Sequence, residues 1–461
     1  VGSSEREHHA FLGIVRMEAT MKEALDIAVS WERLDEGAVE ECACFGLLTI
    51  RQGNRLLTEG IDGFIDSTRR GPLVSGYHLA EWLAWNWWRL TGEPMPKRMS
   101  HDWSFAHSLA TIGAGYLWPN ISIFSDREHT VLIAKPTHPD GFAPFRFTAD
   151  QAIILPTRQF VAVVDRFMEQ IQGQLRAKAI PLTNFDRIFD ELQAERTDSK
   201  MAAGRKLEAL LGCDPDEASV EEIERLFADA EGFGWDAIQE LAADHQPGRS
   251  IPRMSDLTAL AATIGTDTRP GDIPLLPTTE LPPRDQVPAW RHGYETARVL
   301  RVACGLQSGP LPDQRLADLS GVSVQVLAAS PSAGHVFAFS LDDESGKAGH
   351  IVLRSKWATG RRFELARLLG DRLTTGYLNE RLLPATRAYT YRQKFQRAFA
   401  AELLCPFEAL KEQMDGDYSA DAREDVAHYF GVSERTVTTL LVNYKCIDRS
   451  YLDEDLEILA A

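Results

Sequence analysis

A stretch crowded with prolines sets the strongest limit on how this chain can fold. The sequence TDTRPGDIPLLPTTELPPRDQVP, which begins at Thr266, repeats a residue that has a fixed φ and no backbone N–H. Neither a long helix nor a central strand can run through it, so it predicts a linker at residues 266–287. The 461 residues also exceed what one core usually organises. We therefore expect an α+β protein of several domains.

The hydrophobic pattern on either side of the linker indicates what these domains contain. Residues 1–150 mix both periodicities and predict a domain of helices and strands of unknown type. Residues 151–265 follow helical spacing and predict a mainly helical region. Residues 288–461 follow the linker and form a C-terminal domain. These ranges are the predicted division of the chain.

Composition places the chain among globular proteins. Hydrophobic residues make up 44% of it and charged residues 25%, which is typical of that class. No apolar run reaches the roughly 20 residues of a membrane-spanning helix. The first residues lack a basic region followed by an apolar stretch, so we expect no secretory signal, a cytoplasmic location and no membrane partner. The six cysteines form no CxxC pair, and we expect reduced thiols.

Four segments of the N-terminal region have clear patterns. Residues 1–40 repeat apolar side chains at helical spacing and predict a helix. CACFGLLTIRQGNRLLTEG alternates about the turn-forming RQGN and predicts a hairpin. SGYHLAEWLAWNWWRL predicts a helix that opens at Ser75 and buries its tryptophans. NISIFSDREHTVLIAKP predicts two strands joined by a turn at Ser125–His129.

One dense set of reactive side chains lies in the N-terminal half. Its members are His101, Asp102, His107, Asp126, Glu128, His129 and Lys135. They favour a nuclease-like or metal-binding site if they converge in one pocket. Against that, the two histidines of HDWSFAH lack the i, i+4 spacing of a helical metal pair, and DREH falls where a hairpin turn exposes its residues. An N-terminal enzyme is therefore an alternative hypothesis.

Beyond the linker, helical and strand patterns follow in quick succession. HGYETARVLRVACG predicts a helix that Gly305 closes, and DQRLADLSGVSVQVL predicts a short helix followed by a strand. HVFAFSLDDESGKAGHIVLRSK predicts two strands around the turn DDESGK. GRRFELARLLGDRL, from Gly360 to Leu373, has apolar residues at helical spacing and predicts a core helix.

This order of elements resembles the ImmA/IrrE family of zinc metallopeptidases over about residues 288–447. The helix of that family typically reads RRFTLAHELGH, where this chain has RRFELARLLGD. A second family helix is similar to FQRAFAAELLCP, and a third segment is similar to VAHYFGVSERTVTTLLVNYKCI. The resemblance implies a zincin-like fold that ends in a helix-turn-helix-like segment.

The residues that carry the chemistry of the family are different in this chain. An HExxH helix holds zinc with two histidines one turn apart, and its glutamate takes a proton from the bound water. The corresponding positions hold Arg367, Leu368 and Asp371, and the third family ligand falls within residues 392–397, which contain no acid. Arginine repels a metal and leucine accepts no proton. The resemblance therefore implies a pseudo-peptidase.

Other residues could rebuild such a site or replace it. His350, Glu402 and Cys405 are the nearest candidate ligands in the sequence. The simplest replacement is an ion pair between Arg367 and Asp371, which are four residues apart on the predicted helix. We therefore expect no metal or other cofactor and no peptidase activity.

The resemblance also implies a function. Members of the family work with helix-turn-helix repressors in stress, mobile-element and toxin–antitoxin control, and often bind a partner protein through the peptidase cleft. The leading hypothesis is a non-catalytic regulatory or adaptor protein that binds a protein partner through its degenerate peptidase domain, within stress, mobile-element or phage-defence control.

A second alternative is a DNA-binding regulator. Without the family, VAHYFGVSERTVTTLLVNYK itself resembles a helix-turn-helix. Its candidate DNA contacts are Ser433, Arg435, Thr436, Thr439 and Lys445. The net charge of −18 and the acidic residues that follow the segment oppose nucleic-acid binding.

Overall fold

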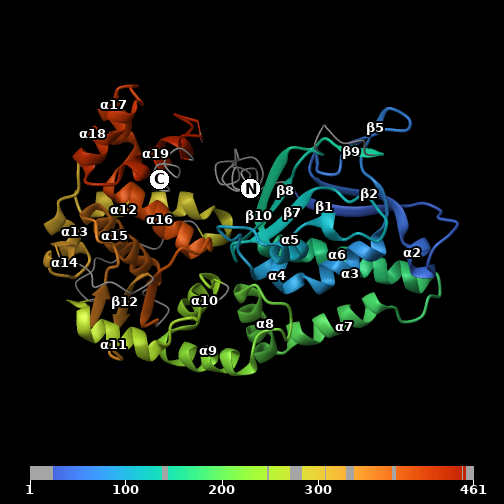
Figure 1. Cartoon of the computed structure of the whole chain (residues 1–461), viewed down its shortest axis with the longest axis horizontal. Coiled ribbons are helices and arrows are strands. Elements are labelled where there is room, and N and C mark those ends of the chain that lie inside the picture. The colour runs from blue at the N-terminus through green and yellow to red at the C-terminus, as the bar shows by residue number, and fades with distance from the viewer. Residues whose placement is uncertain are drawn as a thin grey trace. The chain divides into compact units, whose positions relative to one another are not determined.

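The computed structural model describes residues 24–137, 144–246, 249–269, 283–306, 308–328, 337–375, 380–448 and 450–452 (Figure 1). The described residues separate into two compact units, an N-terminal unit that ends at Ser219 and a C-terminal unit that begins at Val220. The protein is a mixed α+β structure, as the sequence predicts. The four-part division of the chain stays a prediction.

The N-terminal unit combines short antiparallel sheets with helices. Its elements are β1 (Leu25–Trp31), α2 (Val39–Ala43), β2 (Phe45–Gln52), β3 (Arg55–Leu56), β4 (Gly60–Asp62), β5 (Ser67–Arg69), β6 (Leu73–Ser75), α3 (Gly76–Trp85), α4 (Trp87–Gly92), α5 (His101–His107), η2 (Leu109–Thr111), β7 (Ile121–Ser125), β8 (His129–Ala134), β9 (Phe145–Phe147), β10 (Gln151–Pro156), α6 (Thr157–Ala177), α7 (Asn184–Thr197) and α8 (Ser199–Leu211).

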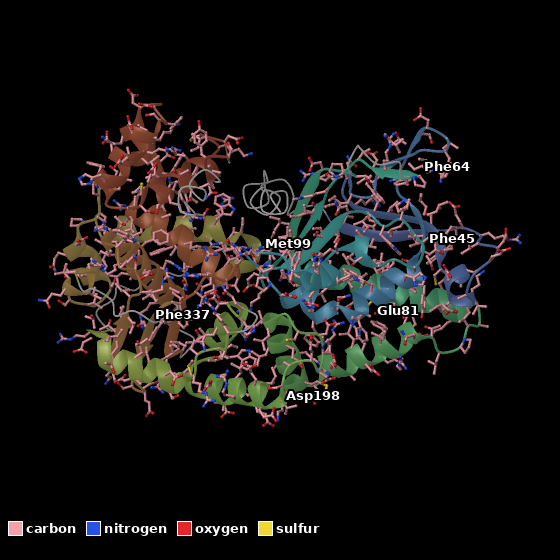
Figure 2. The ribbon with its side chains drawn as sticks, viewed as in Figure 1. Phe45, Phe64, Glu81, Met99, Asp198 and Phe337 are labelled. Carbon is pink, nitrogen blue, oxygen red and sulfur yellow. The ribbon has the colours of Figure 1, made fainter. Side chains whose placement is uncertain are left out.

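Three sheets and a long amphipathic helix build the N-terminal core. β2 pairs with β1, β3 and β6, the second sheet has the order β10-β8-β7, and the third has the order β5-β4-β9. The helix α6 turns one apolar face inwards, including Phe160 and Phe167, and packs against α3 and β1. The loop between β4 and β5 points away from this core and exposes Phe64 (Figure 2).

Most local predictions for this unit are confirmed. The hairpin about RQGN is formed by β2 and β3, and β7 and β8 meet at the predicted turn. The tryptophan-rich helix begins after Ser75, breaks at Asn86 and continues as α4. Trp87 and Trp88 are buried, as expected, although Trp85 is exposed.

The helix predicted for residues 1–40 is wrong where it can be compared. Residues 1–23 lie outside the described residues, and Leu25–Trp31 form the strand β1. All seven residues of β1 pair with β2, and alternate residues from Leu25 to Val29 are buried. Alternation and helical spacing overlap in so short an apolar segment, and cross-strand pairing decides between them.

The C-terminal unit is mainly helical. Its elements are α9 (Val220–Phe233), α10 (Trp235–Ala243), α11 (Met254–Ile264), β11 (Thr266–Thr268), η5 (Arg284–Gln286), α12 (Ala289–Ala303), α13 (Asp313–Leu319), α14 (Gln325–Ala328), β12 (Ala338–Asp342), β13 (Gly349–Val352), α15 (Ala358–Thr375), β14 (Leu382–Ala385), α16 (Tyr391–Leu404), α17 (Phe407–Met414), α18 (Ala420–Phe430) and α19 (Glu434–Asn443).

Three helices and one sheet form the frame of this unit. The sheet has the order β11-β13-β12-β14, and α16 packs against both α12 and α15. Two glycines permit the close packing. A Cβ on Gly293 would lie 2.6 Å from the carbonyl oxygen of Phe395, and one on Gly370 would lie 2.4 Å from the ring of Phe399. Larger side chains there would push α12 or α15 away from α16.

Most C-terminal elements also match their predictions, with two corrections. Residues 266–268 belong to the sheet as β11 rather than to the linker, because they pair with β13. The strand expected after the short helix α13 is absent from the described residues there: Gln325–Ala328 form α14, and Val322 makes only an isolated bridge to Thr268. Its apolar residues are buried among helices, where they need no ladder partner.

No helix within the described ranges is both long and apolar enough to cross a bilayer.

Candidate functional site

The candidate site is the interior between α15 and α16, where the three positions that the resemblance aligns with a zinc motif lie. Leu368 is buried in the hydrophobic core. Arg367 and Asp371 are also buried, one turn apart on α15, and both face polar residues of α16 and the segment that leads into it. The close contact at Gly370 sets the distance that these side chains span.

Arg367 is held by neutral oxygens. Its Nη2 donates to the carbonyl oxygen of Thr386 at 2.7 Å, to Oε1 of Gln393 at 2.6 Å and to Oε1 of Gln396 at 3.1 Å. No carboxylate contacts this guanidinium among the described residues. Burial lowers the pKa of Arg367 to about 9.

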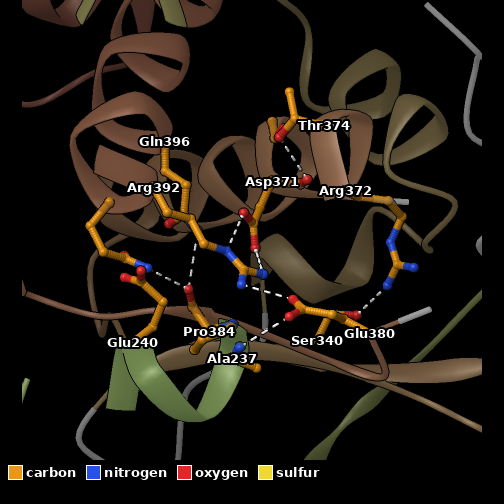
Figure 3. A network of polar contacts seen from close by, with 12 residues as sticks. Ala237, Glu240, Ser340, Asp371, Arg372, Thr374, Glu380, Pro384, Arg392 and Gln396 are labelled. Atoms are coloured by element: carbon orange, nitrogen blue, oxygen red, sulfur yellow. Dashed lines mark hydrogen bonds and ion pairs between the residues drawn. The ribbon is translucent and has the colours of Figure 1, made fainter. Parts of the chain in front are cut away.

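The two glutamines are fixed by a shared acceptor. The side-chain amides of Gln393 and Gln396 both donate to the carbonyl oxygen of Pro384, at 3.0 and 3.1 Å. Their carbonyl oxygens therefore turn towards Arg367 (Figure 3 shows Gln396 and Pro384). Both glutamines are fully buried. The side-chain amide nitrogen and carbonyl oxygen of each glutamine therefore have hydrogen-bond partners, as buried polar groups usually do.

Asp371 pairs with Arg392 rather than with Arg367. Nε and Nη2 of Arg392 donate to the two oxygens of Asp371 at 2.8 and 2.7 Å, and Nη1 donates to Glu380 at 2.8 Å (Figure 3). Burial works against the charge of Arg392, but the two carboxylates outweigh it and raise its pKa. The buried guanidinium is thus neutralised in place.

The predicted ion pair between Arg367 and Asp371 is therefore wrong. Both residues lie on α15 at the predicted spacing, but each side chain reaches across to α16 and its neighbours. The bidentate geometry of Arg392 on Asp371 satisfies both carboxylate oxygens, which a neighbour on the same helix rarely achieves. A partner from another helix outcompeted the local one.

A second set of contacts lies where the chain leaves β14 and enters α16. Asp244, which caps α10, accepts a hydrogen bond from the backbone N–H of Arg387 at 3.0 Å. Nη2 of Arg397 donates to the carbonyl oxygen of Ala388 at 3.0 Å. A pocket opens here; its lining residues include Leu241, Asp244, His245, Arg249, Phe337 and Arg387.

The other candidate ligands are not gathered at this site. Glu402 is buried and accepts hydrogen bonds from Arg298 and from the backbone of Phe407. Burial raises the pKa of Glu402 to about 7 and also raises the pKa of the Cys405 thiol. His350 lies on β13 beside Asp267. Within the described ranges, no three His, Cys, Asp or Glu side chains are arranged to hold a metal ion.

Two residues that the sequence pattern did not indicate, Arg89 and Glu93, connect part of the N-terminal cluster. Arg89 donates to Glu93, Asp102 and Asp214 with its three nitrogens, at 2.7, 2.9 and 3.1 Å. His107 is buried between Glu93, at 2.9 Å from Nε2, and the carbonyl oxygen of Ile123, at 2.6 Å from Nδ1. Each ring nitrogen of His107 therefore faces an oxygen atom, one from a side chain and one from the backbone.

The remaining members of this cluster are spread over the unit. His101 is exposed at the start of α5. Asp126 and His129 lie at the β7–β8 turn, but they are buried rather than solvated, because Asp126 accepts the backbone N–H of His129 at 2.8 Å and closes the turn. Lys135 follows the far end of β8, about 20 Å along the strand from His129.

The helix-turn-helix-like segment is formed by α18 and α19, with Gly431 in the left-handed region between them at φ 63°. Ser433 caps α19 and contacts the Thr436 hydroxyl, while the Thr439 hydroxyl donates to its own helix. Arg435 is exposed, as is Lys445. Three acidic residues are exposed on α18: Asp421, Glu424 and Asp425.

No protein-family model matches this chain, and no curated protein matches it significantly.

Proposed function

We propose that this chain is a non-catalytic regulatory or adaptor protein that binds a protein partner through a degenerate ImmA/IrrE-like domain. The observation that carries the proposal is the pairing of Asp371 with Arg392 beside an arginine at position 367. The interior where the resemblance expects a metal is filled by guanidinium groups and their acceptors.

The chemistry of these side chains supports a non-catalytic role. Arg367 carries a positive charge into the position of a metal ligand, and Leu368 cannot accept a proton from water. Both oxygens of Asp371 are occupied by a guanidinium. Metal binding at these positions would require breaking a buried ion pair and burying two positive charges together. These residues do not fit the zinc ion that the resemblance implies.

An exposed tryptophan supports binding of a protein partner. Trp357, directly before α15, is 68% exposed. Large aromatic residues are frequent anchors of protein interfaces, and an exposed one beside the former peptidase helix is a candidate anchor for a partner. Lys356 lies 5.6 Å from the centre of its ring and adds a charge to the same surface.

Zinc stoichiometry tests the degenerate site. The purified protein is incubated with zinc chloride, separated by gel filtration and measured by elemental analysis. We expect near-zero zinc in the natural chain. A gain-of-function control is Arg367→His/Leu368→Glu/Asp371→His/Gln393→Glu, which supplies two histidines and two acids on facing helices and should retain zinc if folded. Stoichiometric zinc in the natural chain would overturn the proposal.

Partner binding is tested separately. The full chain is purified from its native cells, co-purifying proteins are identified, and each is reconstituted with the pure chain by calorimetry. Trp357→Ala should weaken binding at least tenfold, while Trp85→Ala, another exposed tryptophan in the N-terminal unit, should leave it unchanged. Cleavage of the reconstituted partner at a defined bond, or equal binding by both variants, would contradict the proposal.

DNA binding stays the alternative because the α18–α19 pair has a helix-turn-helix arrangement and an exposed Arg435. The exposed acids on α18 oppose it. A DNA reader should lose affinity steeply with salt, and Arg435→Ala should reduce that slope. Titration of the chain onto labelled duplex DNA at several salt concentrations distinguishes this alternative from the adaptor.

A further inference from the structure

A strained loop covers part of the N-terminal core. Residues 113–115, which follow η2, all lie in the left-handed region, at φ 71°, 53° and 79°. Glycine adopts this conformation readily, but Ala114, between two glycines, is strained in it. Beyond the turn, Trp118 is buried in the core and Tyr116 packs against it. Contacts with other elements must therefore offset the strain to keep the loop in place.

One hydrogen bond latches this loop to α2. The hydroxyl of Tyr116 donates to Oε1 of Glu41 at 2.5 Å. Burial and the neighbouring Glu41 carboxylate raise the pKa of Tyr116, so the phenol keeps its proton for this bond. Glu41 is itself tied to the start of α3, because the hydroxyl of Ser75 donates to its backbone carbonyl oxygen at 2.9 Å. The carboxylate of Glu41 therefore connects the loop to two helices.

A histidine of α3 lies beside the same carboxylate oxygen. Nε2 of His78 is 3.8 Å from Oε1 of Glu41. This nitrogen is buried and has no hydrogen-bond partner among the described residues. The ring of His78 also lies beside the rings of Tyr116 and Tyr77, with centroids 6.0 and 5.5 Å away. A small movement of the ring would bring Nε2 within hydrogen-bond distance of Glu41.

The charge of this surrounding depends on the imidazole. The other titratable residues near these rings are acidic or neutral: Glu40, Cys42 and Glu81. Histidine ordinarily gains its proton near about pH 6.5, and glutamate ordinarily stays ionised above about pH 4.3. Between these values, a protonated His78 would face the carboxylate of Glu41 and form a charge-assisted hydrogen bond with it.

We infer that His78 is a pH-sensitive lock on the loop of residues 112–118. When its ring is protonated, Nε2 donates to Glu41, and the carboxylate is held by α3 as well as by Tyr116. When the ring is neutral, the charge that attracts the carboxylate is lost. The lock therefore acts below about pH 6.5 and is released as the pH rises through that value. It lies in the N-terminal unit and is independent of the partner site proposed at Trp357.

Hydrogen exchange of the full chain, followed by mass spectrometry, measures the lock. Deuterium uptake of residues 112–118 is recorded at about pH 5.5 and about pH 7.5, on either side of the ordinary histidine pKa, and corrected for the intrinsic exchange rate. We expect at least threefold more protection at the lower pH. His78→Gln cannot be charged and should show the lower protection at both. Tyr116→Phe should lower it further and remove the pH dependence, because Glu41 reaches the loop through Tyr116.

Two controls separate His78 from other titrating groups. His101→Gln removes an exposed histidine of α5 and should keep the natural response. The loop of residues 63–66 contains no histidine and should exchange equally at the two pH values after correction. Peptides from β2 and α6 report whether each variant is folded, and Glu41→Gln is a second variant that should abolish the response.

The other outcomes decide against the lock. Equal protection of residues 112–118 at the two pH values in the natural chain overturns it, and so does weaker protection at the lower pH. A response that persists in both His78→Gln and Glu41→Gln belongs to another group, such as His107 before the loop, and also overturns it.

Discussion

The two compact units both bury arginine, but they neutralise it to different degrees. In the N-terminal unit, all three nitrogens of Arg89 face carboxylates, from Glu93, Asp102 and Asp214. In the C-terminal unit, Arg392 is matched in the same way, but Arg367 is not. A matched arginine is neutralised where it links elements of the fold, while Arg367 links α15 to Gln393 and Gln396 of α16 through neutral oxygens alone. The difference predicts that the two kinds of buried arginine will respond differently to substitution.

The largest loss of stability should come from removing a carboxylate that pairs with Arg392. Asp371→Ala leaves the buried Arg392 with Glu380 alone, and we expect the free energy of unfolding to fall by about 3–5 kcal/mol. Urea denaturation of the two chains measures it. The double variant Asp371→Ala/Arg392→Met should recover part of the loss. A change below about 1 kcal/mol would contradict the importance of the pair.

The N-terminal counterpart should be somewhat more tolerant. Glu93→Ala removes one acceptor from Arg89 and the acceptor of His107 Nε2, but Arg89 keeps Asp102 and Asp214. We expect a loss of about 2–3 kcal/mol. Trp103, whose ring stacks on His107 at 4.3 Å, gives a local fluorescence signal. If Glu93→Ala costs more than Asp371→Ala, the ranking of the two units is wrong.

Glu402 should make the stability of the C-terminal unit depend on pH. Burial raises its pKa from 4.5 to about 7, so the folded state holds this proton more tightly than the unfolded state. Its contribution to stability is full below pH 4.5 and is lost as the pH rises through 7. Glu402→Gln should remove that dependence. Its unfolding free energy relative to that of the natural chain should therefore rise by about 2–3 kcal/mol from pH 5 to pH 8.

The matched control for that experiment is Glu408→Gln. Glu408 contacts the same Arg298 at 3.7 Å but is largely exposed, so it should change the pH profile little. Denaturation of the three chains at several pH values gives the comparison. Parallel profiles for the natural chain and Glu402→Gln would show that Glu402 is not the titrating group.

The smallest change in stability should come from substituting Arg367, which has no direct carboxylate partner among the described residues. Arg367→Gln removes a buried charge together with its hydrogen bonds, and we expect the unfolding free energy to change by no more than about 1 kcal/mol. A small gain in stability agrees with this expectation as well as a small loss does. A loss as large as that of Asp371→Ala would mean that Arg367 is a structural brace.

Local patterns predicted the elements of the site but not its pairings. The helices α15, α16, α18 and α19 follow from apolar spacing, because each buries one face. Gln393 and Gln396 were missed as partners of Arg367, since neutral amides are common on helices and only a facing helix gives them a role. Their spacing of three residues on a predicted core helix is the signal that could have found them.

Two errors share a physical cause. Residues 25–31 form a strand because all seven pair with β2. Asp371 pairs with Arg392 because that guanidinium donates to both of its carboxylate oxygens. In both places a partner distant in sequence outweighed a local preference. The burial of Asp126 and His129 has a different, local cause, because Asp126 accepts the backbone N–H of His129 three residues later.

The contact at Gly370 also limits how this sequence can change over evolutionary time. A side chain there would separate α15 from α16 at Phe399 and so disturb both arginines at once. Substitutions at Arg392 or Asp371 can be compensated by a second substitution at the partner, whereas a side chain at Gly370 would require a smaller residue in place of Phe399 and so cost core packing. Across descendants of this chain, Gly370 should stay constant while the charged residues around it are exchanged in pairs.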